Sequence, residues 1–132
     1  MSWDVMIFNL NRKVASVDEI DDSVLVDIGT KTDFKKLMTD NFPDVICEND
    51  WGKIERKDFA IEFSLGDSDE PFSNTVFHLY GENAIYAMID LCKKQNWQLF
   101  DTGLEQMLDL DNPEKNGYKN HQAYVRQILN GQ

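Results

Sequence analysis

Residues 58–65 alternate strictly between large apolar side chains and small or polar ones, and this pattern restricts the fold more than any other feature of the chain. The large apolar side chains are Phe59, Ile61, Phe63 and Leu65. Because successive side chains of a strand point to opposite faces of the sheet, the pattern predicts a strand with one buried face. Turn-forming residues follow at 66–71, and residues 75–80 again have the composition of a strand. This part of the sequence therefore predicts an antiparallel pair of strands.

Hydrophobic spacing and turn residues predict the other elements in the same way. Further strands are expected at residues 3–8, 51–56 and 97–100, with residues 107–110 as either a short strand or an extended return. Helices are expected from the cap Thr32 to Pro43, at residues 82–95, and around Tyr124, Val125, Ile128 and Leu129. We therefore expect one α+β domain over residues 1–132. It is predicted to be a two-layer sandwich with a mainly antiparallel sheet of four to five strands and two to three helices, similar to a split βαβ arrangement.

The chain has 132 residues, of which 42% are hydrophobic, so it can bury a core without disulfides or a metal. No segment reaches the roughly 20 apolar residues of a membrane span. Residues 1–4 lack the basic and apolar start of a signal peptide. Cys47 and Cys92 are isolated from each other and from histidine, which suits a reducing compartment. We expect a cytoplasmic protein that does not enter membranes.

The charge of the chain is strongly negative, with 13 Lys and Arg against 24 Asp and Glu and a net charge of −11. A negative field repels nucleic-acid phosphates and anionic lipid surfaces, so neither is an expected partner. A basic protein is the partner that the charge favours.

Two acidic clusters and one tryptophan are the candidate partner-binding residues. The first cluster is Asp18, Glu19, Asp21 and Asp22, and the second is Asp67, Asp69 and Glu70. Each cluster is either a solubilising surface or a docking site for a basic partner. Trp51 lies between Asp50 and Gly52, a loop-edge setting in which an exposed indole would anchor an interface.

No catalytic residue, metal ligand or cofactor is assigned from the sequence. The chain has two histidines and two cysteines, which are too scattered for a zinc site, and neither histidine lies in a nucleophile motif. The turn at Gly81 has one glycine and an acidic neighbour, unlike a phosphate-binding loop. Asp101, Glu105 and His78 are the candidate residues of an enzyme, because carboxylates distant in sequence can converge in a fold. An enzyme is the less favoured class.

Three segments of the chain resemble a family of small acidic bacterial proteins without established activity. They are Met-Ser-Trp-Asp-Val at residues 1–5, Leu-Tyr-Gly-Glu-Asn at residues 79–83 and Asn-Trp-Gln-Leu-Phe-Asp-Thr-Gly at residues 96–103. The size and acidity of the chain are also similar in class to immunity proteins that neutralise secreted bacterial toxins. That similarity implies an acidic surface placed over a basic partner.

Three classes of function follow from these observations. The first is a non-enzymatic, immunity-like protein-binding module that engages a basic partner through its acidic loops. The second is a small enzyme or small-molecule-binding protein with a pocket between the sheet and the helix at residues 82–95. The third is a structural or regulatory domain that forms a homodimer through a sheet edge.

Overall fold

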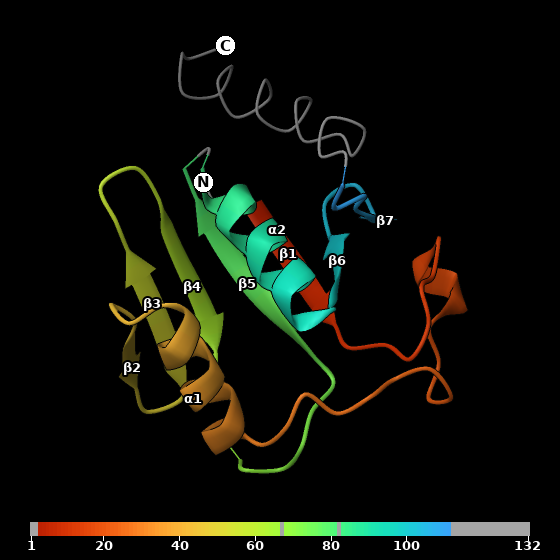
Figure 1. Cartoon of the computed structure of the whole chain (residues 1–132), viewed down its shortest axis with the longest axis horizontal. Coiled ribbons are helices and arrows are strands. Elements are labelled where there is room, and N and C mark those ends of the chain that lie inside the picture. Colours follow the sequence, from red (N-terminus) through yellow and green to blue (C-terminus); the bar gives the residue numbers. More distant parts are fainter. Residues whose placement is uncertain (1–2, 67, 82, 112–132) are drawn as a thin grey trace.

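The computed structural model describes residues 3–66, 68–81 and 83–111. Within these residues, seven strands form one antiparallel sheet in the order β2-β3-β4-β5-β1-β6-β7 (Figure 1). The strands are β1 (Trp3–Phe8), β2 (Ile46–Glu48), β3 (Trp51–Glu55), β4 (Ala60–Ser64), β5 (Asn74–Tyr80), β6 (Gln98–Asp101) and β7 (Gln106–Met107). The helices are η1 (Val17–Glu19), a 3-10 turn, and the α-helices α1 (Lys31–Asn41) and α2 (Ala84–Gln95). The α+β class predicted from the sequence is confirmed.

The sheet is larger than the four to five strands expected. Strand β2 was not expected, and β7 overlaps the possible short strand at residues 107–110 only at Met107. These two strands have three and two residues and lie at the two edges of the sheet. Such short segments have too few side chains to show an alternating pattern. The third helix, expected around Tyr124, Val125, Ile128 and Leu129, lies outside the described residues.

Strand β1 lies between β5 and β6 and is antiparallel to both. Strands β5 and β6 therefore run parallel to each other, and α2 connects them. Strands β2 to β5 form a meander of neighbouring antiparallel strands on the β5 side. Because β1 separates the two strands joined by α2, this unit has the split βαβ arrangement.

Both α-helices lie on the same face of the sheet (Figure 1). The buried side chains of α1 are Phe34 and Met38, whereas α2 buries six residues along its length. The Phe34 ring meets those of Phe63, Phe72 and Phe77 edge to face, at centroid distances of 5.7, 5.2 and 6.2 Å. Edge-to-face contacts of this kind add to the free energy gained by burying the rings.

The opposite face of the sheet is covered in part by the long connection between β1 and α1. Leu10, Val14 and Val24 of this connection form a second core with Phe8 and Phe100. The Phe8 and Phe100 rings are also packed edge to face, with centroids 6.4 Å apart. This connection therefore closes the back of the sheet around β1 and β6.

The N-cap of α1 is Thr30, not Thr32 as predicted. The Thr30 hydroxyl accepts from the Asp33 backbone N–H, and the Asp33 carboxylate accepts from the Thr30 N–H. This reciprocal capping box needs an acceptor three residues after the cap, and Asp33 provides it for Thr30. The backbone N–H of Thr32 instead donates to Asp69, at 3.1 Å.

Neither described α-helix is long and apolar enough to cross a membrane.

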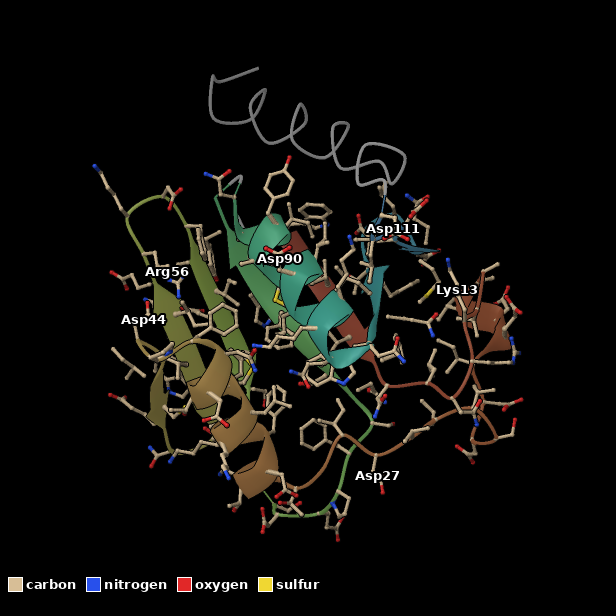
Figure 2. All side chains as sticks on the ribbon, in the orientation of Figure 1. Lys13, Asp27, Asp44, Arg56, Asp90 and Asp111 are labelled. Atoms are coloured by element: carbon tan, nitrogen blue, oxygen red, sulfur yellow. The ribbon has the colours of Figure 1, made fainter. Side chains whose placement is uncertain are left out.

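Arg56 ties the turn after β3 to the segment that leaves α1. Its guanidinium donates to both carboxylate oxygens of Asp44, at 3.1 and 3.0 Å (Figure 2). The same group lies over the rings of Phe42 and Phe59, 5.5 and 5.7 Å from their centroids. Hydrogen bonding from Arg56 holds the pKa of Asp44 below its ordinary value of 3.8. The pair is exposed, so its contribution to stability is small.

Replacing Asp44 by Asn is expected to reduce the free energy of unfolding by about 0.5–1 kcal/mol at neutral pH, the upper range for an exposed ion pair. A carboxyl whose pKa is lowered by folding stabilises the protein above its unfolded pKa, and this contribution disappears as pH falls through the folded pKa. Urea unfolding should therefore show a difference between wild type and Asp44→Asn at pH 7 that shrinks as the pH falls below 3.8, the ordinary pKa of the carboxyl. Asp22→Asn, at an exposed site without an ion pair among the described residues, is the control. A pH-independent difference would contradict this role of the pair.

Gly52 of β3 is required by the ring of Phe63 on the neighbouring strand. A Cβ atom at Gly52 would lie 2.5 Å from Cζ of Phe63, whose side chain is buried. Replacing a strand glycine by alanine ordinarily gains about 0.5–1 kcal/mol, whereas overpacking a core costs about 1–3 kcal/mol. We expect Gly52→Ala to destabilise the protein. In a double-mutant cycle, Phe63→Leu should relieve at least half of that cost, and additive effects would contradict the contact.

Candidate functional site

No described helix lies on the second face of β2, β3, β4, β5 and the start of β1. We call this surface the open face. It carries side chains from five strands, because residues paired across neighbouring strands point to the same side. Its members are Asp4, Met6, Ile46, Glu48, Trp51, Lys53, Glu55, Ala60, Glu62, Ser64, Val76, His78 and Tyr80. All of these are half-buried or exposed.

A row of register partners crosses the open face at its centre. It runs through Asp4, His78, Glu62, Lys53 and Ile46, one residue from each of five strands. Nδ1 of His78 lies 2.8 Å from a carboxylate oxygen of Asp4, and Nζ of Lys53 lies 3.7 Å from one of Glu62. Acidic groups therefore alternate with a histidine and a lysine along the row.

Trp51 and Ile46 are the exposed large apolar residues of the open face, with 38% and 55% of their surface accessible. Ile46 of β2 is the register partner of Lys53 of β3. Because Lys53 comes two residues after Trp51 on β3, the side chains of Ile46 and Trp51 are diagonal neighbours on the sheet. Carboxylates of Glu48, Glu55 and Glu62 belong to the same face. Trp51, which the sequence marks as an interface anchor if exposed, is exposed at the start of β3.

The first predicted acidic cluster lies on the connection after β1, at the opposite side of the molecule from β2 (Figure 1). Glu19 caps η1 by accepting from the backbone N–H groups of Ala15 and Ser16, which lowers its pKa. Asp21 accepts from the hydroxyl and backbone N–H of Ser23, and these bonds lower its pKa. Asp18 and Asp22 are exposed. Two of the four carboxylates therefore stabilise the local loop structure.

The second cluster lies in the loop between β4 and β5. Asp69 accepts from the backbone N–H and the hydroxyl of Thr32, and Glu70 is exposed, whereas Asp67 lies outside the described residues. This loop begins at the end of the sheet where Trp51 is found, because the Leu65 N–H donates to the Asp50 carbonyl. The loop that carries Asp69 and Glu70 therefore begins at the Trp51 end of the sheet, away from the first cluster.

The three residues suggested for catalysis do not meet. His78 lies on the open face, whereas Asp101 belongs to the helix-covered face, where it is fully buried and accepts from the N–H groups of Gly103 and Leu104. Glu105 is exposed in the turn between β6 and β7.

Burial raises the pKa of the Cys92 thiol to about 12, which keeps it a protonated, unreactive group. Within the described residues, no three His, Cys, Asp or Glu side chains are grouped to hold a metal ion.

A cavity of about 310 Å³ lies where the end of α2 meets β6, β7 and the connection after β1. Its lining includes Arg12, Lys13 and Lys93, three cationic residues of an acidic chain. None of these was a candidate from the sequence, because residues 12–13 and 93 are 80 positions apart and only the fold brings them together. The one signal was the adjacent pair of basic residues at 12 and 13.

Comparisons of the chain with protein-family models, curated proteins and solved structures found no match. The resemblance to small acidic bacterial proteins and to immunity proteins therefore stays a prediction from the sequence.

Proposed function

We propose that this protein is a non-enzymatic binding module that engages a basic partner protein through its open face. The observation that carries the proposal is the exposure of Trp51 and Ile46 together on a sheet surface rich in carboxylates. Exposed tryptophan is the residue type most often responsible for affinity at protein interfaces. More specifically, the proposed role is that of an immunity-like protein in the cytoplasm of a bacterium.

Charge supports a basic partner. The open face has four carboxylates, Asp4, Glu48, Glu55 and Glu62, against the single lysine Lys53, so these five residues sum to a charge of −3. The whole chain adds a long-range field of the same sign. Complementary charge of this kind accelerates association and rejects acidic competitors.

The carboxylates of the two acidic loops steer the basic partner toward the protein by long-range attraction. Asp18 and Asp22 are exposed on the first cluster, and Glu70 is exposed on the second. Their carboxylates attract a basic partner at low salt, whereas Glu19, Asp21 and Asp69 also hold the loops in place.

The short edge strands favour partner binding on the open face over pairing of a partner strand with the edge of the sheet. The edge strands β2 and β7 have three and two residues, so each offers few backbone groups to an added strand. A homodimer formed through an edge therefore has little surface to use, and the broad open face is the better interface.

Replacing Trp51 by Ala tests the proposal. Immobilised wild-type protein should capture a basic protein from a lysate of its source organism in a one-to-one ratio at low salt and release it at high salt. Trp51→Ala should weaken binding of the purified partner by about 30-fold or more, the effect of losing an interface anchor. Tyr86→Ala removes an exposed aromatic side chain on α2 and is the matched control.

Unchanged affinity of Trp51→Ala for the captured protein would contradict the proposal. Equal loss of binding in Tyr86→Ala would also contradict it, because the helix side would then carry the contact. Capture of a second copy of this chain would favour the homodimer.

A further inference from the structure

We propose that the cavity at the end of α2 binds an organic anion with an apolar body, a carboxylate or sulfonate on a hydrocarbon skeleton. This inference is independent of the open face, since the cavity lies at the β6 and β7 side of the sheet. Its volume of about 310 Å³ is within the lower range of small-molecule sites.

The cavity has an apolar floor. Trp97 and Leu108 line it and are buried in the main core, while Leu10 and Val14 line it from the second core. Met107 and the partly buried Leu110 complete the apolar part of the lining. A ligand with a hydrocarbon body gains free energy by displacing water from these side chains.

The rim of the cavity is cationic. Arg12, Lys13 and Lys93 line it against one carboxylate, Asp111, so the lining has a net charge of +2. Residues 1–111 as a whole contain 10 basic and 23 acidic side chains, a net charge of −13. The cavity is therefore a local reversal of the charge of the molecule. A ligand bound here gains most when it carries negative charge.

The cations of the rim are available to a ligand. Lys13 makes no ion pair with the described residues, and it lies at the same side of the molecule as Asp111 (Figure 2). Arg12 pairs with Glu19 at 3.3 Å, and Lys93 pairs with Asp111 at 3.3 Å, both at exposed positions. Exposed ion pairs of this kind contribute little to the stability of the protein, so a bound anion can replace the carboxylate partner of Arg12 or Lys93.

The walls of the cavity are held in place by hydrogen bonds that do not involve a ligand. The Gln98 side chain accepts from the Val14 N–H at 3.0 Å and donates to the Arg12 carbonyl at 2.8 Å, which fastens the connection after β1 to β6. Asn96 ends α2 in the left-handed conformation, and its N–H donates to the carbonyls of Cys92 and Lys93. A preformed site of this kind loses little entropy on binding.

The test uses two fluorescent probes with the same skeleton, 1-anilinonaphthalene-8-sulfonate and the neutral N-phenyl-1-naphthylamine, added to the folded full chain. We expect saturable one-to-one binding of the sulfonate, at least about tenfold tighter than the neutral probe. Lys13→Met should weaken sulfonate binding about threefold and Lys13→Met/Lys93→Met about tenfold, because each substitution removes a charge and keeps the aliphatic chain. Lys57→Met, in the turn after β3, removes the same charge far from the cavity and should change the affinity less than about twofold.

Amide chemical shifts recorded during the sulfonate titration identify the site. The largest changes are expected at Lys13, Lys93 and Gln98. Equal affinity for the two probes, equal weakening by Lys57→Met, shifts centred elsewhere, or no saturable binding would each overturn the proposal. The open-face proposal would be unaffected by these results, because Trp51→Ala tests a different surface.

Discussion

The buried side chain of Phe34 fixes α1 on the sheet. This ring is fully buried and meets three other phenylalanine rings, two of them from β4 and β5. It places α1 on the same face that α2 covers (Figure 1). Because both apolar helix stripes are buried on one side, the second face has no helix from the described residues to cover it. The long connection after β1 closes only the part of that face around Phe8 and Phe100.

The open face and the cavity at the end of α2 have different chemistry. The open face combines carboxylates with Trp51 and Ile46, the combination on which the proposed binding of a basic protein rests. The cavity at the end of α2 combines cations with an apolar floor, as expected of a site for a small anion. The open face and the cavity lie on different parts of the sheet, so substitutions can test the two proposals separately.

The sequence predicted the elements whose side-chain pattern is long enough to read. The alternation around Ile61 marked β4, and helical spacing placed α1 and α2 within two residues of their observed starts. It did not predict strand order, which depends on pairing between distant segments, nor β2, which is too short. The possible short strand expected at residues 107–110 overlaps β7 only at Met107. The acidic, loop-edge surroundings of Trp51 marked it as an interface anchor if exposed, and its exposure follows from the fold. The separation of Asp18 and Asp22 from Trp51, and the meeting of Lys13 with Lys93, follow only from the fold.

The key measurement is whether the open face is exposed to solvent in the full chain. A neutral gadolinium chelate relaxes nuclei according to their accessibility, and the isoleucine methyl groups are matched probes on the two faces. An exposed open face predicts strong relaxation of the Ile46 methyl and the Trp51 indole N–H, with Ile54 and Ile61 protected. Protection of Ile46 and Trp51 to the level of Ile54 and Ile61 would contradict it, because the proposed binding surface would then be covered within the protein itself.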